Sequence, residues 1–156
     1  MKTVIRFVNT IDIAREPSAV YAYLADLEHM PEWNWAVTST EKPTPGAIAV
    51  GSRHRQQRSV PRRGVETLEL TALEPLRRIG VAGRLGPFDA PLSYEHDPVA
   101  AGTRLTNVAA LEPPVRLGFV GDLVGERIRA SVAENLGVLR VVLDGRRAME
   151  ALGVAA

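Results

Sequence analysis

Cysteine is absent from this chain of 156 residues, so disulfide bonds, thiolate metal ligands and cysteine nucleophiles are excluded. The chain also has no large excess of charge of either sign, because 19 Lys and Arg residues are matched by 18 Asp and Glu residues, for a formal net charge of +1. A balance of this kind gives no general attraction to nucleic acids or anionic membranes. No apolar run approaches the roughly 18 residues that span a bilayer. We therefore expect no nucleic-acid partner and no membrane insertion.

Motifs for common cofactors and nucleophiles are missing as well. The chain has no G-x-G-x-x-G, P-loop or G-x-S-x-G sequence, so nothing predicts nucleotide binding or an acyl-enzyme serine. The 3 histidines lie far apart and lack the short spacing typical of a zinc site. Glu66 and Glu69 fall on opposite faces of their predicted strand, which excludes them as a carboxylate pair. We expect no cofactor and no metal.

The N-terminal segment predicts a strand rather than a signal peptide. Ile5, Phe7, Ile11 and Ile13 recur at even spacing, as in a half-buried strand, and polar residues between them interrupt the apolar run. A pair of short helices is expected next, the first beginning at Pro17 because proline suits a first helical turn. A cytoplasmic location is the default expectation.

The middle of the chain predicts an antiparallel meander of six strands. Short strand-like segments alternate with turns rich in proline and glycine, rather than with helices. After the first of these strands, which ends before Pro43, the expected strands are 50–60, 65–73, 77–85, 91–96 and 103–111.

The C-terminal part predicts one long amphipathic helix over residues 118–144. Its apolar residues recur every three or four positions, and Gly145 predicts its end. We take residues 1–145 as one ligand-binding domain, and residues 146–156 as a tail or an extension of the helix. A curved sheet must cover its concave face, and this helix is the one element long enough to do so. With only 3 Phe, 2 Trp and 3 Tyr, we expect the two surfaces to leave a cavity between them.

The order of these elements resembles the START/Bet v1-like (SRPBCC) superfamily, in particular its polyketide cyclase/dehydrase and lipid-transport family. The resemblance covers about residues 3–145 and is carried by IDIAREPSAVYAYLADLEHMPEW, Val50-Gly51-Ser52, ALEPLRRI, SYEHDPVAAGTRLT and the C-terminal helix. It implies an α+β helix-grip fold, with a curved antiparallel sheet of about seven strands wrapped around the long helix. It also implies a cavity for a polyketide- or lipid-like ligand, but no single reaction.

The strand over residues 50–60 is unusually polar. Alternation places His54, Gln56 and Arg58 on one face, and the resemblance implies that His54 points into the cavity. There, His54 and Gln56 would be polar contacts for a ligand carbonyl or hydroxyl. The alternative is an edge strand whose polar residues face solvent.

Tyr94 and His96 share one face of a later strand, and the resemblance implies that both point inward. A neutral histidine near pH 7 can give or take a proton, and a tyrosine hydroxyl can bind a developing enolate oxygen. We therefore take His54, His96 and Tyr94 as candidate catalytic residues. The alternative for the last two is a core tyrosine and a histidine that reaches solvent or Asp97.

Further residues are expected to line the cavity. Asn107 follows Leu105 on an inward face, where a buried amide needs a hydrogen-bond partner. Trp33 matches a tryptophan that the resemblance places at the cavity rim, and Trp35 would lie at the mouth. The expected ligand-binding residues are Trp33, Trp35, Gln56, Leu68, Leu70, Leu105, Asn107, Val124 and Ile128.

Five arginines cluster around one hairpin: Arg53, Arg55, Arg58, Arg62 and Arg63. We interpret them as a solvated face; the alternative is a dock for an acidic partner such as an acyl carrier protein. Two functions remain in competition. The protein either holds a small hydrophobic ligand as a carrier or sensor, or cyclises or dehydrates a polyketide by orienting it beside acid–base groups. Whether it acts as a monomer or a homodimer is left open.

Overall fold

A computed structural model describes residues 4–60, 62–85 and 87–153. It contains seven strands and four helical segments in an α+β order. The elements are β1 (Ile5–Ile13), α1 (Pro17–Ala25), the 3-10 helix η1 (Leu27–His29), α2 (Met30–Trp33), β2 (Val37–Glu41), β3 (Arg53–Arg58), β4 (Gly64–Glu74), β5 (Arg78–Leu85), β6 (Phe88–Val99), β7 (Gly102–Leu111) and α3 (Val120–Ala151).

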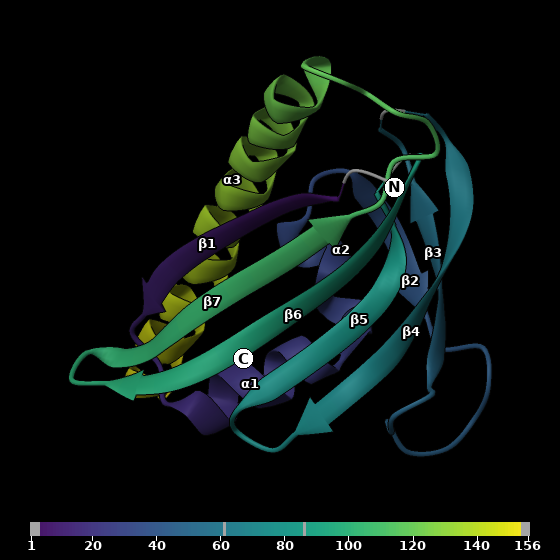
Figure 1. Cartoon of the computed structure of the whole chain (residues 1–156). Coiled ribbons are helices and arrows are strands. Elements are labelled where there is room, and N and C mark those ends of the chain that lie inside the picture. The colour runs from purple at the N-terminus through teal and green to yellow at the C-terminus, as the bar shows by residue number, and fades with distance from the viewer. Residues whose placement is uncertain (1–3, 61, 86, 154–156) are drawn as a thin grey trace.

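The strands form one antiparallel sheet in the order β1-β7-β6-β5-β4-β3-β2. From β2 to β7 each strand pairs with the next along the chain, and β1 then adds beside β7, with Ile5 opposite Leu111. The sheet is strongly curved, and α3 runs obliquely across its inner side, while α1 lies at the lower end of the sheet and α2 lies behind its middle (Figure 1). The helix-grip fold predicted from the sequence is confirmed.

Helix α3 buries one stripe of side chains against the sheet. Leu136, Leu139 and Leu143 are almost completely buried, and they join the main core together with residues of β1, α1, β4 and β5. The first half packs on β1 at close range, because a Cβ atom at Gly125 would lie 2.5 Å from Cγ2 of Ile5. Among the described elements, no helix is both long and apolar enough to cross a bilayer.

Several predicted boundaries are wrong: β3 spans Arg53–Arg58 rather than 50–60, and both β6 and α3 extend beyond their predicted ends. Helix α3 does not stop at Gly145 but continues to Ala151. Its last turns are held by side chains: Arg146 pairs with Glu32, and Glu150 pairs with Arg15. Residues 146–151 therefore follow the second alternative given for 146–156, an extension of the helix, whereas 154–156 lie outside the described residues. Strand β6 also outruns its prediction of 91–96, since Pro98 pairs with Thr103 just before the hairpin turn, where a missing N–H costs little.

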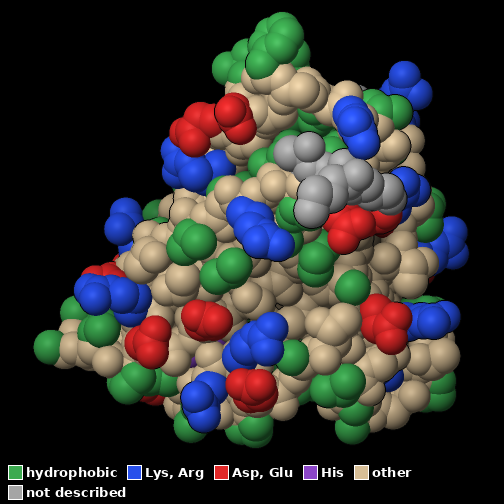
Figure 2. Space-filling view, in the orientation of Figure 1, with side chains coloured by type: hydrophobic (Ala, Val, Ile, Leu, Met, Phe, Trp, Pro, Cys, Tyr) green, Lys and Arg blue, Asp and Glu red, His purple; other side chains and the backbone are tan. Residues whose placement is uncertain are grey.

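The two ends of α3 differ in their surroundings. The C-terminal end is held by ion pairs and by Arg147, which donates to the carbonyl of Ala14. The N-terminal end projects past the sheet, with Phe119 and Leu123 largely exposed. Figure 2 shows apolar side chains gathered at this projecting end, while basic and acidic side chains are interspersed over the outer face of the sheet.

Candidate functional site

Two neighbouring hollows, which share part of their lining, lie beneath the N-terminal half of α3. The inner cavity has a volume of about 50 Å³, and the outer groove has a volume of about 330 Å³. Four residues line both and so mark their junction: Asn34, Arg58, Val132 and Asn135. The junction thus brings together the segment after α2, the end of β3 and the middle of α3.

The inner cavity is lined by five residues that the sequence analysis selected: Trp33, Gln56, Leu68, Tyr94 and Asn107. The rings of Trp33 and Tyr94 meet edge to face with their centroids 6.4 Å apart, which fixes both rings. Burial raises the pKa of Tyr94 to about 12. Tyr94 therefore stays neutral at physiological pH, and its hydroxyl can serve as a hydrogen-bond donor.

The outer groove contains the other three selected residues that line a hollow: Trp35, Val124 and Ile128. Trp35 is 54% exposed, so its ring stands at the mouth. Phe88 and Val132 extend the apolar wall. The groove is wide enough for a small ring system and offers it mainly carbon surface.

The two selected histidines lie elsewhere. His54 and His96 both point into the protein and are almost fully buried, but neither lines the inner cavity or the outer groove. His96 meets the edge of Tyr21, with ring centroids 5.5 Å apart. Burial lowers the pKa of each imidazole, so both are neutral near pH 7. Their ring nitrogens have no hydrogen-bond partner in the described part of the chain.

Leu70 and Leu105 also face inward without lining either hollow. Both are fully buried and belong to the main core cluster. The structure thus brings eight of the twelve selected residues to the two hollows and leaves His54, His96, Leu70 and Leu105 in the packed interior.

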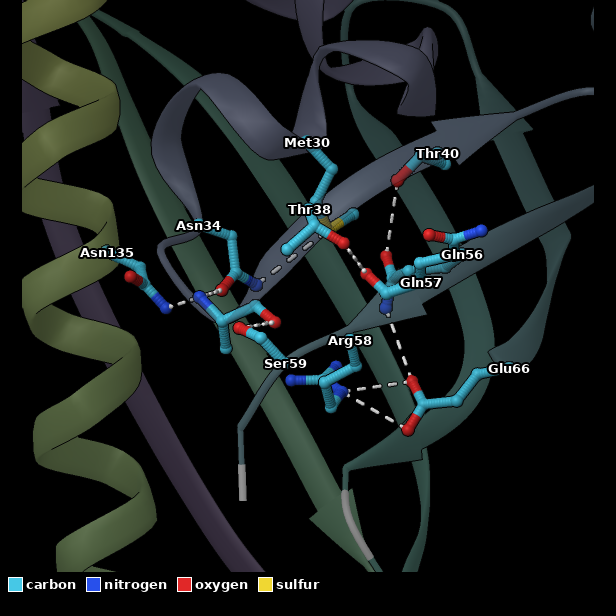
Figure 3. A network of polar contacts seen from close by, with 11 residues as sticks. Met30, Asn34, Thr38, Thr40, Gln56, Gln57, Arg58, Ser59, Glu66 and Asn135 are labelled. Atoms are coloured by element: carbon cyan, nitrogen blue, oxygen red, sulfur yellow. Dashed lines mark hydrogen bonds and ion pairs between the residues drawn. The ribbon is translucent and has the colours of Figure 1, made fainter. Parts of the chain in front are cut away.

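Arg58 is the buried basic side chain of the site, whereas Arg84 at the inner cavity and Arg127 at the outer groove are exposed. The Nε–H of Arg58 donates to both carboxylate oxygens of Glu66, at 3.2 and 3.1 Å, and Gln56 donates to the same carboxylate at 3.3 Å. Thr40 in turn donates to the side-chain oxygen of Gln56, which extends the network across β2, β3 and β4 (Figure 3). Among the described residues, the hydrogen bonds of the Arg58 guanidinium run from Nε to Glu66. The terminal nitrogens of Arg58 therefore remain available to a ligand in the hollows that this residue lines.

The interpretation of all five clustered arginines as a solvated face is wrong for Arg58. Arg53 and Arg55 are exposed as predicted, but Arg58 is buried with Glu66. Sequence reasoning missed Glu66 as its partner. The signal was present, because Glu66 shares a strand face with the buried residues Leu68 and Leu70, and an acid on such a face needs a basic partner.

The amide groups of Asn34 and Asn135 close the junction. Asn34 Oδ1 accepts from the backbone N–H of Ala36 at 3.1 Å and from Asn135 Nδ2 at 3.2 Å. Deeper in, Asn107 Nδ2 donates to the carbonyl of Ser93 at 3.3 Å. Within residues 4–60, 62–85 and 87–153, no group of three His, Asp or Glu side chains is placed to hold a metal ion.

Solved structures with the same fold support this description. The chain superimposes on the di-domain ARO/CYC StfQ from the steffimycin biosynthetic pathway with a TM-score of 0.71 and 15% identity, over 93% of this chain and 52% of that one. It therefore spans about half of that di-domain protein. A START superfamily protein from Mycobacterium smegmatis gives 0.66 and 18% over 90% and 95% of the two chains. Ara h 8.0201 gives 0.60 and 12% over 88% and 99%.

At these identities the structural matches establish the fold alone. A comparison with curated proteins finds no match. The family assignment comes from a sequence model described as polyketide cyclase / dehydrase and lipid transport, which matches residues 4–144 and so covers every element from β1 to most of α3. The chain belongs to the polyketide cyclase/dehydrase and lipid transport family.

Proposed function

We propose that this protein binds a small, mostly apolar molecule, with its carbon skeleton in the outer groove and a polar oxygen at Arg58. The observation that carries the proposal is the groove of about 330 Å³, which joins a narrower cavity at a buried guanidinium. Apolar walls with a few convergent polar groups are typical of small-molecule sites.

Magnitudes favour a ligand that uses both parts of the site. A bicyclic ring that buries about 150 Å² of apolar surface gains roughly 4 kcal/mol, and a hydrogen bond to a charged group adds about 1.5–3 kcal/mol. The loss of the ligand's translational and rotational freedom opposes binding by several kcal/mol. An apolar contact alone would therefore bind weakly, and the guanidinium selects ligands with a carbonyl or enolate oxygen.

The placement of the histidines supports a carrier or sensor over an acid–base enzyme. His54 and His96 line neither hollow, so the two strongest candidates for proton transfer stand outside the site. A cyclase or dehydratase is the second candidate, favoured by Tyr94, which lines the inner cavity together with Arg58. In this function the site would orient a bound polyketide so that one of its enol carbons meets one of its carbonyl groups. The neutral Tyr94 hydroxyl would stabilise the developing enolate oxygen.

Binding is tested by titration calorimetry with 2-acetylnaphthalene, a ketone on a bicyclic ring. Ile128→Trp fills the groove and should weaken binding at least roughly tenfold, since the ring loses its apolar site. Val141→Trp is the matched control, because Val141 lies on the exposed side of the same helix. Equal affinity of the two variants, or no heat of binding in the unmodified protein, would overturn the proposal.

Catalysis is tested separately with 2,4,6-heptanetrione, which closes to a dihydroxytoluene with loss of one water. If the protein is a cyclase, it accelerates this reaction, and Tyr94→Phe lowers the rate by about a hundredfold through loss of an oxyanion donor. A rate equal to that in buffer excludes this cyclisation and leaves the carrier or sensor function.

A further inference from the structure

The amide of Asn135 is held in one orientation by a chain of hydrogen bonds. The backbone N–H of Ala36 can only donate, so the atom of Asn34 that it meets is the oxygen. That oxygen also receives the Asn135 side chain, which must therefore present its NH₂ group. The oxygen of Asn135 is turned the other way and is buried without a partner in the described part of the chain.

Asn107 shows the same pattern from the opposite wall. Its NH₂ group meets the backbone carbonyl of Ser93, which can only accept, and this fixes the orientation of the amide. Its oxygen is again buried without a partner among residues 4–60, 62–85 and 87–153. Asn107 is fully buried, and Asn135 is 8% exposed.

Both asparagines line the inner cavity. Buried acceptors of this kind are normally satisfied, so each implies a donor that enters the cavity. The volume of about 50 Å³ exceeds the roughly 10–15 Å³ that one water-sized group needs. It is far too small for a ring, which has to remain in the outer groove.

These constraints point to one chemical class. We infer that the inner cavity receives a hydroxyl group of the ligand, which donates to Asn107 Oδ1 or Asn135 Oδ1, so that the protein selects hydroxylated ring compounds such as phenols and enols. The inference rests on the proposed function, since it adds a second polar contact to the same site. The guanidinium of Arg58 donates hydrogen bonds, so it binds a ligand oxygen that accepts them. The free oxygens of the two asparagines accept hydrogen bonds, so they require a ligand group that donates.

The test compares two probes with the same ring. Titration calorimetry at pH 7 measures the dissociation constants of 2-naphthol and 2-methoxynaphthalene, which differ in whether the oxygen carries a proton. We expect 2-naphthol to bind at least about tenfold more tightly. The preference should fall to within about twofold in Asn107→Leu and in Asn135→Leu, which keep the side-chain size and lose the acceptor.

Asn9→Leu is the matched control, because Asn9 is a buried asparagine outside both hollows whose amide oxygen and nitrogen both bond to Arg129. The preference for 2-naphthol should survive in this variant. Equal affinities of the two probes in the unmodified protein would overturn the inference. If Ile128→Trp then still weakens both probes, the proposed function stands. If 2-acetylnaphthalene and both probes fail to bind, the proposed function itself fails.

Discussion

Arg58 and Glu66 form a buried ion pair between neighbouring strands, with side chains only 9% and 12% exposed. Arg58 also lines both hollows of the site. In the proposed function this side chain has two roles, since the carboxylate holds the guanidinium in place and the guanidinium would offer its remaining donors to a ligand.

Breaking this pair on one side should be costly. Arg58→Met leaves the Glu66 carboxylate buried without its cation, and we expect the free energy of unfolding to fall by about 3 kcal/mol. Arg58→Met combined with Glu66→Met removes both charges and should recover most of that loss. Urea denaturation measures both variants. A double variant as unstable as the single one would contradict the role given to the unpaired carboxylate.

Acid should destabilise the fold through His54 and His96. Burial lowers the pKa of both below the ordinary value of 6.5, while Asp26 and Glu28 near His54 partly oppose the shift. The unfolded chain therefore binds more protons than the native chain below that value. Stability is fully present above pH 6.5 and declines as the pH falls, by up to about 1.4 kcal/mol per pH unit for each histidine.

Urea denaturation between pH 8 and pH 5 measures this decline. His54→Leu removes one of the two titrations and should flatten the curve over that range. A variant that loses stability as steeply as the unmodified protein would show that other groups cause the decline.

Two glycines of α3 should respond in opposite directions to alanine. Alanine at Gly137 meets no atom within 4 Å and should stabilise the helix by about 1 kcal/mol. Alanine at Gly125 gains the same helix propensity but places its Cβ atom 2.5 Å from Ile5, so β1 or α3 must shift. We expect a higher melting temperature for Gly137→Ala and a lower one for Gly125→Ala. A higher melting temperature in both variants would show that β1 moves away from α3 at little cost in free energy.

Tryptophan emission should report ligand binding. Trp35 is half-exposed at the mouth of the groove, and Trp33 is already buried. A ring entering the groove removes water from Trp35 and should shift its emission to shorter wavelength. Trp35→Phe should abolish the shift, and Trp33→Phe should retain it. The opposite result would place the ligand in the inner cavity.

The sequence predicted the architecture well because alternation and turn residues are local signals. Ile5, Phe7 and Ile13 define the face of β1 without any knowledge of its neighbours. The end of α3 was missed because a glycine stop is a local signal, which ion pairs with distant residues such as Arg15 and Glu32 override.

The site was predictable only in part. Alternation indicates which residues share a face of a strand, and the family resemblance placed His54 and Tyr94 on the inward face, where the structure buries them. Alternation does not indicate where along the strand the helix stands away from the sheet. That position depends on packing between distant segments, which is why Tyr94 lines the inner cavity and His96, two residues later, is enclosed by the core.

The position of β1 has a consequence for how the molecule forms. Its partners are the last strand, β7, and the final helix, including the contact of Asn9 with Arg129, 120 positions away. Strand β1 can therefore pair only after segments far along the chain have come close to it. Such distant closures slow the search for the native state, so we expect the joining of the two chain ends to set the refolding rate.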